Sequence, residues 1–600
     1  MATDDAAPTS HAAELSQKMT ANLARLEELS ARLVATLSHK REVPVELTRP
    51  GTDLYARAAG AYMTEMFTNP ARLMEMQVGY WGRTLTTYLE AQQRLARGDL
   101  SAPPDAAPGD SRFASDAWRD NPFFAYLKQQ YLVNGEAVMQ AIDELEGLPE
   151  RDRRRLRYFS EQIVNMMSPT NFLGTNPDAL QRAVETEGQS LVDGLENLVR
   201  DLERNDGELL VTLADPEAFR VGENIATTPG KVVFRNRLFE LIQYAPATET
   251  VHRTPLVIFP PWINKFYILD LKEKNSLIKW VVDRGITLFV VSWVNPDASY
   301  AEVGLDDYVE DGFLRAIAEV KDITGEDRVN TVGYCIGGTT LALTLALMHR
   351  RGDRSVNSAT FFTTLTDFSN QGEVGVFLED DFVDGIEREV SDKGYLDSFY
   401  MGRTFSFLRS NDLIFKPAVR SYMMGEAPPA FDLLFWNGDG TNLPARMAVD
   451  YLRGLCQSDL FATEGFQICG ETVHLRDVTV PLIAIACETD HIAAWKSSFR
   501  GMQKTGSRSR TFILSESGHI AGIVNPPSKR KYGHYTNGDW SGTPEEWQAA
   551  AEFHEGSWWG RWGAWLAKRS GRQVPARIPG AGREVLADAP GTYVIGGRPD

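Results

Sequence analysis

Apolar residues recur at two different spacings along the chain, and the spacing changes near residue 215. Over 19–37, leucines recur at helical intervals among Arg and Glu; they are Leu23, Leu26, Leu29 and Leu33. Further helical patterns cover about 70–97 and 122–202. We therefore expect a tail over 1–17 and a mainly α-helical N-terminal domain over 18–215.

Short apolar runs separated by helical segments follow after about residue 215. Two β-rich runs come first, at 231–234 and 238–245; the later runs are at 255–259, 286–293, 328–333, 358–365, 480–487 and 511–514. Apolar strands that alternate with helices indicate an α/β fold with a mostly parallel sheet buried on both faces. Two initial strands followed by this alternation predict an α/β-hydrolase domain over 216–600.

A long segment, about 366–475, interrupts the alternation of strands and helices. It is rich in Phe, Asp and Gly and contains the aromatic run 431–436, which ends at Trp436. An insertion at this place in a hydrolase core is typically a cap over the active site. The alternative is a surface excursion without function.

The pentapeptide Gly333-Tyr334-Cys335-Ile336-Gly337 carries the strongest chemical signal. It is a nucleophile-elbow pattern with cysteine in place of serine, and it lies between an apolar run and a small-residue helical run. The helix N-terminus favours a thiolate at Cys335. The alternative is a buried structural cysteine.

A cysteine nucleophile needs a base, and the base needs an orienting acid. Asp490 follows the apolar run 480–487, and His519 follows the run 511–514, which is the chain order of an α/β-hydrolase. Competing residues are the histidines and glutamates nearby: His491, His534, Glu488 and Glu516.

An oxyanion formed during acyl transfer needs N–H donors. We expect one from the backbone of Ile336 and another from the loop after the third strand. Pro260 and Pro261 have no N–H, so the loop donor is expected at Trp262 or Ile263.

Bulk composition restricts the function classes. The 600 residues carry a formal charge of −19, which argues against a general nucleic-acid binder. The 4 cysteines are too few for a disulfide scaffold, and their spacing does not suggest structural zinc. The N-terminus lacks the apolar core of a signal peptide, and no apolar run is long enough to span a membrane. A cytoplasmic protein without a metal or cofactor is expected.

The chain resembles the class I poly(3-hydroxyalkanoate) synthases through most of its length. The matching stretches are at 113–118, 121–124, 168–173, 228–233, 260–265, 292–297, 333–338, 436–437 and 518–519. The resemblance implies that Cys335 is the acylated nucleophile, that His519 is its base and that Asp490 is the third catalytic residue. Whether Asp490 activates a hydroxyl or only orients His519 stays open.

The resemblance also implies the reaction and the partners. The substrate is an (R)-3-hydroxyacyl-coenzyme A with a short side chain, such as 3-hydroxybutyryl-coenzyme A, and the product is a polyester with release of coenzyme A. Moving an acyl group from one thiol to another is nearly thermoneutral, so Cys335 would keep the acyl group activated. A homodimer is expected, as is contact of the N-terminal domain with a phasin or the surface of polyhydroxyalkanoate granules.

Several residues are weaker candidates for the site. Trp436, Asn264 and His491 are candidates for contact with substrate or cap. The basic run Lys529-Arg530-Lys531 could meet the phosphates of coenzyme A, although a solvated charge run is the alternative. The stretch 558–565 is predicted to be a terminal helix that packs on the core.

Two other function classes compete with the polymerase. One is a monomeric cysteine hydrolase or thioesterase resembling dienelactone hydrolase. The other is a non-catalytic granule-associated protein that keeps the fold.

Overall fold

The computed structural model describes the chain except for residues 1–6, 41–51, 69, 98–106, 108 and 598–600. Contacts divide the chain into two compact units. The first comprises residues 1–215 together with 405–429, and the second comprises 216–404 together with 430–600.

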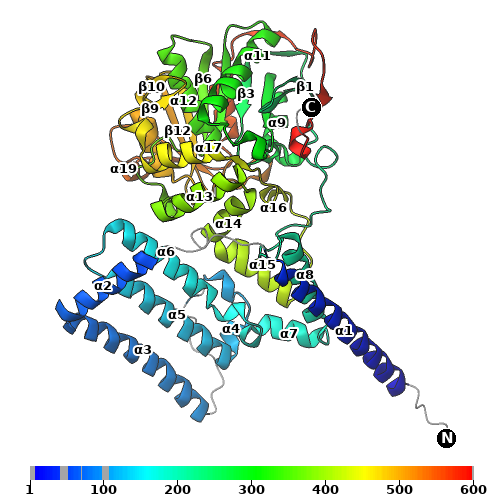
Figure 1. Ribbon diagram of the computed structural model, residues 1–600, viewed down its shortest axis with the longest axis vertical. Helices are drawn as coiled ribbons and strands as arrows, with labels where there is room; N and C mark the ends of the chain where they lie inside the picture. The colour runs from blue at the N-terminus through cyan, green and yellow to red at the C-terminus, as the bar shows by residue number, and fades with distance from the viewer. Residues whose placement is uncertain (1–6, 41–51, 69, 98–106, 108, 598–600) are drawn as a thin grey trace. The chain divides into compact units, whose positions relative to one another are not determined.

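The first unit is helical (Figure 1). Its helices are α1 (Ala7–Ser38), α2 (Thr52–Thr68), α3 (Pro70–Ala96), α4 (Ala117–Asp120), α5 (Pro122–Asp143), α6 (Glu150–Met166), α7 (Pro177–Glu185) and α8 (Gln189–Arg204). Helix α1 begins inside the stretch 1–17 that was expected to be a tail. It packs on α8, where Leu29 is buried against Val192 and Val199. Leu26 and Leu33 pack on this cluster as well, whereas Leu23 is 62% exposed, so the leucine pattern marks a packed face only in part.

Residues 405–429 belong to the first unit although they lie inside the predicted insertion 366–475. They include two π-helical turns, η10 (Asn411–Phe415) and η11 (Val419–Met423). The hydroxyl of Tyr422 donates to Asp201 of α8 at 2.7 Å. A Cβ atom at Gly194 would lie 2.1 Å from the carbonyl oxygen of Tyr422, so only glycine permits this close approach.

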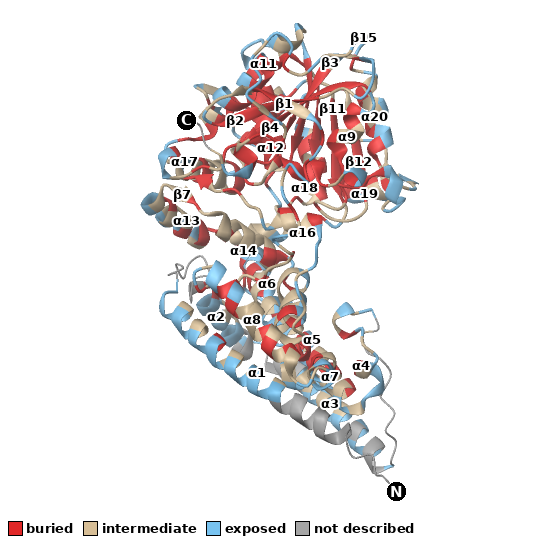
Figure 2. Ribbon diagram, turned by 90° about the vertical axis from the view of Figure 1, so that its right-hand side faces the viewer, coloured by how far each residue is buried: buried red, intermediate tan, exposed pale blue. Residues whose placement is uncertain are grey.

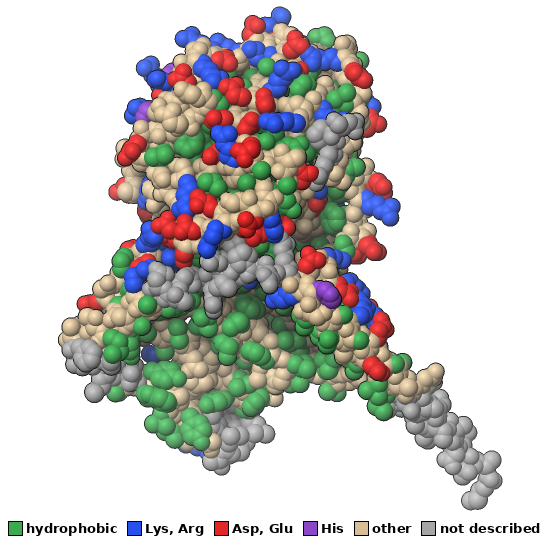
Figure 3. Space-filling view, viewed as in Figure 1, with side chains coloured by type: hydrophobic (Ala, Val, Ile, Leu, Met, Phe, Trp, Pro, Cys, Tyr) green, Lys and Arg blue, Asp and Glu red, His purple; other side chains and the backbone are tan. Residues whose placement is uncertain are grey.

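Helix α3 presents large apolar side chains to solvent at helical spacing. They are Val78, Trp81, Leu85, Tyr88 and Leu89, each 46–66% exposed. Figure 3 shows hydrophobic side chains gathered over the N-terminal helices. A contiguous exposed apolar surface of this kind is uncommon on a protein that has no partner.

The second unit is built on a mixed sheet of 12 strands among the described residues. The strands run in the order β14-β13-β12-β11-β6-β5-β3-β4-β2-β1-β16, and β15 pairs with β3. Their bounds are β1 (Gly230–Arg235), β2 (Phe239–Tyr244), β3 (Thr250–Phe259), β4 (Ile286–Trp293), β5 (Val329–Tyr334), β6 (Val356–Phe362), β11 (Leu482–Cys487), β12 (Arg510–Ser515), β13 (His534–Thr536), β14 (Glu552–His554), β15 (Gln573–Pro575) and β16 (Ala587–Asp588).

Strands β4, β3, β5, β6, β11 and β12 are parallel neighbours. Their carboxyl ends therefore meet at one edge, where open α/β sheets place their ligands. Four short strands form two separate two-stranded sheets: β7 (Tyr395–Leu396) pairs with the distant β8 (Leu443–Pro444), and β9 (Phe466–Ile468) forms a hairpin with β10 (Glu471–Val473).

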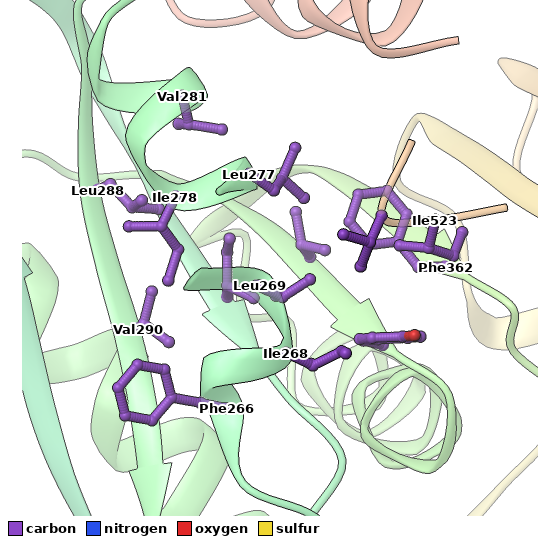
Figure 4. Packing of buried hydrophobic residues seen from close by; sticks show 14 of the residues in the cluster. Phe266, Ile268, Leu269, Leu277, Ile278, Val281, Leu288, Val290, Phe362 and Ile523 are labelled. Atoms are coloured by element: carbon purple, nitrogen blue, oxygen red, sulfur yellow. The ribbon is translucent and has the colours of Figure 1, made fainter. Parts of the chain in front are cut away.

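Helices pack against the sheet, whose strands are largely buried (Figure 2). They are α9 (Leu277–Val282), α11 (Arg315–Thr324), α12 (Ile336–Arg350), α18 (Trp495–Lys504), α19 (Pro544–Ala549) and α20 (Trp559–Ala567). Figure 4 shows Ile278 of α9 beside Leu288 of β4. The second unit also contains α10 (Leu305–Asp307), α13 (Asp380–Lys393), α16 (Asp432–Asn437) and α17 (Ala445–Val449), whereas α15 (Lys416–Ala418) belongs to the first unit and α14 (Ser398–Leu408) spans the boundary.

The predicted fold class is confirmed: an α/β-hydrolase core with a mixed sheet and a helical N-terminal region. The stretch 558–565 forms a helix that packs on the core, as predicted, with Trp558, Trp559 and Trp562 buried and Arg561 exposed. Strand β3 begins at Thr250, earlier than its apolar run suggested, because its polar half pairs with β15 near the C-terminus. Among the described residues, no helix carries an apolar stretch that could cross a bilayer.

Candidate active site

Cys335 occupies the sharp turn between β5 and α12. Its backbone has φ 52° and ψ −125°, a strained conformation for a residue with a side chain. Its N–H donates to the carbonyl of Phe362 at 2.8 Å, which ties the turn to the neighbouring strand β6. The thiol is therefore placed at the carboxyl edge of the sheet and at the N-terminus of a helix.

Glycines make this turn sterically possible. A Cβ atom at Gly333 would lie 2.4 Å from the Cα atom of Gly338, and one at Gly337 would lie 2.6 Å from the carbonyl oxygen of Pro260. Real Cβ atoms do not approach other atoms this closely, so both positions require glycine. The glycine at 337 also allows the loop after β3 to lie directly against the start of α12.

Asp490 and His519 form a buried pair at the ends of β11 and β12. Their Oδ2 and Nδ1 atoms are 2.7 Å apart, and their side chains are 0% and 8% exposed. The other carboxylate oxygen of Asp490 accepts the N–H groups of Ile492 and Ala493, both at 2.8 Å. These bonds fix the carboxylate, which in turn orients the histidine ring with Nε2 free to meet a nucleophile.

The side chain of Cys335 lies close enough to the His519 ring to act on the pKa of that ring. Burial alone lowers the pKa of His519, but the charges of Asp490 and Cys335 and the hydrogen bonds to both outweigh it, so the pKa is raised well above its usual value. The ring of Tyr334 stacks on that of His519, with centroids 6.0 Å apart. Asp490 therefore favours the protonated form of the His519 ring.

The loop after β3 lies against the elbow and contains Trp262 and Ile263, the residues predicted to donate to an oxyanion. Trp262 is fully buried, and its indole N–H donates to Oγ1 of Thr340 in α12 at 3.0 Å. The backbone N–H groups of Trp262, Ile263 and Ile336 make no hydrogen bond to any residue that the structure describes. Free N–H groups on both sides of a nucleophile are what an oxyanion hole needs.

Of the competing histidines, His534 has other partners. His534 lies in β13, where Nδ1 contacts the carbonyl oxygen of Gly556 at 3.0 Å, and burial lowers its pKa. His491 directly follows Asp490 and is half-buried, but His519 is the ring that the carboxylate binds.

The competing glutamates are engaged elsewhere. Glu488 accepts a hydrogen bond from the amide of Gln548 at 2.7 Å. Glu516 accepts the backbone N–H of Gly533 at 2.6 Å. Among the acids considered from the sequence, Asp490 is thus the one that meets the histidine.

Trp436 and Asn264 take part in neighbouring contacts. The indole N–H of Trp436, at the end of α16, donates to the carbonyl oxygen of Lys265 at 2.7 Å. Asn264 forms an isolated antiparallel bridge with Gly440. Both are therefore contacts between the inserted segment and the loop after β3.

The basic run Lys529-Arg530-Lys531 is exposed on the loop that follows His519. The start of this loop, 526–528, forms one wall of a groove of about 670 Å³. The groove is also lined by four cationic side chains, Lys272, Lys274, Lys279 and Arg284, and by two acidic ones, Glu273 and Asp283. Lys279 is paired with Asp283 at 2.8 Å.

Sequence reasoning missed Tyr334, Tyr267 and Asp439. Tyr334 lies inside the recognised pentapeptide, and its hydroxyl reaches the carbonyl oxygen of His519 at 3.4 Å. Asp439 follows the aromatic run 431–436 and binds Lys265 and Tyr267. An acidic residue in a glycine-flanked turn is a weak signal, because such turns are common on surfaces.

Replacing Asp490 by Asn should move the titration of His519 to lower pH, because the charge that raises its pKa is removed. NMR of the protein with labelled histidine, with His519→Gln to assign the resonance, measures the midpoint. An unchanged midpoint would contradict the assigned pairing.

Asp490→Asn should also change how the free energy of unfolding depends on pH. A raised histidine pKa contributes stability that is complete below the unfolded value, about 6.5, and is lost as the pH rises through the folded pKa. Urea unfolding at several pH values should show that this contribution is missing in Asp490→Asn.

Comparison with known proteins agrees with this geometry. Residues 109–281 match the family model described as "Poly-beta-hydroxybutyrate polymerase (PhaC) N-terminus", and residues 255–526 match the "alpha/beta hydrolase fold" model. A poly(3-hydroxyalkanoate) polymerase of Methylorubrum extorquens is 44% identical over 86% of this chain and 84% of its own length.

Two further relatives are named poly(3-hydroxyalkanoate) polymerase subunit PhaC. The protein of Rhizobium meliloti is 40% identical over 88% of this chain and 86% of its own length. That of Cupriavidus necator is 40% identical over 88% of both chains. With this identity over most of its length, and with the elbow and the buried acid–histidine pair in place, the chain belongs to the poly(3-hydroxyalkanoate) polymerase family.

Proposed function

We propose that the protein polymerises (R)-3-hydroxyacyl-coenzyme A into polyhydroxyalkanoate through an acyl-enzyme on Cys335, and that its substrates are short-chain monomers such as 3-hydroxybutyryl-coenzyme A. One observation carries the proposal. A cysteine at a strained strand–helix turn lies within reach of a buried histidine that an aspartate holds at 2.7 Å.

The first step transfers the acyl group to the enzyme. The thiolate of Cys335 attacks the thioester carbon, and the N–H groups of Ile336 and of Trp262 or Ile263 receive the oxyanion. The bond to the sulfur of coenzyme A breaks, and the imidazolium of His519 gives that sulfur its proton. The products are a Cys335 thioester, free coenzyme A and a neutral His519.

The second step forms the polyester bond. Neutral His519 takes the proton of a hydroxyl from a monomer or chain end, and the oxygen attacks the acyl carbon. Cys335 leaves as a thiolate beside a regenerated imidazolium, so protons balance over the cycle. In this scheme Asp490 orients His519 and stabilises its charged form. A thioester converts to an oxygen ester downhill in free energy, which drives chain growth.

Water must be kept from the acyl-enzyme, since hydrolysis would compete with chain growth. Aromatic side chains from the inserted segment support this requirement. Tyr451, in the π-helical turn η12 (Asp450–Gln457), packs edge-on against Trp262 with centroids 5.5 Å apart, and Phe368 packs on Tyr451 at 6.1 Å. An apolar cover over the loop favours transfer to a hydroxyl held in the site over hydrolysis by bulk water.

Replacing Cys335 by Ala should lower polymer formation at least about a thousandfold, because the acyl carrier is lost. Purified protein is incubated with 3-hydroxybutyryl-coenzyme A while free thiol and turbidity are followed. Cys469→Ala, at another cysteine that is not fully buried, is the matched control and should keep its activity.

The same assay separates the alternative functions. Thiol release with turbidity supports the polymerase, whereas thiol release with only free hydroxy acid indicates a thioesterase. Polymer formation by Cys335→Ala would refute the nucleophile assignment.

The phosphates of coenzyme A are proposed to bind at Lys529, Arg530 and Lys531. These side chains are exposed, and the loop that carries them borders the groove that Lys272 and Lys274 also line. A local basic surface is needed because the whole protein, with a net charge of −19, repels a polyanionic substrate at long range.

Changing all three of these residues to Gln should raise KM for the acyl-coenzyme A about tenfold and leave kcat within about twofold, because exposed charge contacts are individually weak. The N-acetylcysteamine thioester, which has no phosphates, is the control substrate, and its KM should not change. An equal rise of KM with both thioesters would argue against phosphate binding here.

Granule contact is proposed for the exposed apolar face of α3, as either the polyester surface or a phasin bound to it. Val78, Trp81 and Leu85 are each more than half exposed and lie on one side of the helix. Their burial against polyester would be favourable by the ordinary hydrophobic effect.

Replacing Trp81 and Leu85 by Glu should lower the fraction of protein bound to isolated granules about tenfold. Gln92→Glu with Gln93→Glu adds the same charge to the same helix without removing apolar surface, and this control should bind normally. Loss of binding in the control alone, or no loss in the apolar variant, would contradict the assigned surface.

A further inference from the structure

The loop after β3 is held on two sides. Its first part is fixed by the core, because the indole of Trp262 binds Thr340 and the carbonyl of Pro260 accepts the indole N–H of Trp293 at 3.0 Å. Gly337 lets the elbow lie directly against this part. The residues that follow, from Ile263 onwards, have a different set of partners.

Residues 436–442 of the inserted segment supply those partners. The N–H of Thr441 donates to the carbonyl oxygen of Ile263 at 3.2 Å, and Asn264 bridges to Gly440. The indole N–H of Trp436, a residue that is 4% exposed, donates to the carbonyl oxygen of Lys265. Three consecutive residues of the loop are therefore fixed by backbone and indole contacts from the insertion.

Both carboxylate oxygens of Asp439 make further contacts to this part of the chain. Oδ1 lies 2.7 Å from Nζ of Lys265, and Oδ2 accepts the hydroxyl of Tyr267 at 2.8 Å. The Lys265 and Asp439 side chains are 13% and 29% exposed, so the ion pair is only partly screened by water. Burial, and then the charge of Asp439, raise the pKa of Tyr267, which keeps its hydroxyl protonated as the donor.

The backbone geometry ties these contacts to the chemistry. The bond to the carbonyl of Ile263 and the bridge at Asn264 fix the peptide plane that follows Ile263, and the plane that carries the Ile263 N–H is joined to it through a single Cα atom. The N–H of Ile263 is a candidate oxyanion donor, and a donor must lie within a few tenths of an ångström of its productive position. Contacts made by the insertion thus fix the direction of a donor that they do not touch.

We propose that Asp439 is a positioning residue that holds the oxyanion loop in its catalytic conformation through Lys265 and Tyr267. The proposal rests on the proposed function, because it takes this loop to receive the oxyanion of the thioester. Its consequence is that acyl transfer requires segment 436–442 to be docked on the loop.

Single-turnover acylation tests the proposal. The full-length enzyme is mixed with 3-hydroxybutyryl-coenzyme A, and the rate of thioester loss is measured at saturating substrate. Asp439→Ala should slow acylation about 10- to 100-fold, which is the effect of a poorly placed oxyanion donor. Substrate affinity should stay within about threefold. Asp439→Asn, which keeps an acceptor for Tyr267 but loses the ion pair, should have an intermediate effect.

Alkylation of Cys335 by iodoacetamide distinguishes positioning from a general structural role. It needs the thiolate but no oxyanion hole, so its rate should stay within about twofold in Asp439→Ala. The matched control is Asp384→Asn, which removes another carboxylate of the insertion, paired with Arg453 at 2.5 Å, and should leave acylation unchanged. Lys265→Met and Tyr267→Phe provide second variants if Asp439→Ala folds poorly.

A double-mutant cycle completes the test. Because Asp439 and Lys265 act as one unit, Asp439→Ala with Lys265→Met should be no slower than the slower single variant. The inference is overturned if Asp439→Ala acylates at the normal rate, if alkylation falls in the same proportion as acylation, or if the two losses multiply. If the unaltered enzyme acylates a residue other than Cys335, the proposed function fails as well, and the two failures are thereby distinguished.

Discussion

The strained turn at Cys335 is the constraint on which the site depends. A residue with positive φ costs about 1–3 kcal/mol and persists only where its surroundings enforce it. Here the close packing around the turn holds Cys335 in this conformation. Glycine at 333 and 337 makes that packing possible, because any Cβ at these positions would collide with backbone atoms. These contacts bring the loop after β3 against the first turn of α12. One packing arrangement therefore brings together the thiol, the helix N-terminus and the loop after β3.

Around this turn, the parallel sheet brings together residues that are far apart in the sequence. Cys335, Asp490 and His519 follow β5, β11 and β12, whose carboxyl ends share an edge. The rigid strands fix the backbone positions, and hydrogen bonds to Asp490 fix the histidine ring. Reactive groups supported in this way need little reorganisation during acyl transfer.

Much of this arrangement could be predicted from the sequence. The apolar runs located the strands because buried parallel strands are almost continuously hydrophobic, as the eight buried residues of β4 illustrate. The elbow was recognisable because its glycines answer a steric requirement. Asp490 and His519 were expected because each directly follows such a strand.

Other features depend on contacts that a linear pattern does not encode. Residues 405–429 lie inside the insertion, yet they pack with α8 because Gly194 and Asp201 offer a complementary surface. Asp439 stands 174 residues from Lys265 in the chain, and its glycine-flanked turn looks like any exposed loop. The short strands β13 to β16 have no apolar run that would reveal them in the sequence. Strands β13 and β14 extend the sheet beyond β12, and β15 pairs with the polar half of β3.

The account's central claim is that the sulfur of residue 335 carries the acyl group during turnover. The most direct measurement is peptide mass spectrometry of enzyme that is acid-quenched during reaction with 3-hydroxybutyryl-coenzyme A. The account predicts a hydroxyacyl adduct, single or oligomeric, on the peptide containing Cys335. An adduct on a different side chain, or no adduct while polymer accumulates, would contradict it.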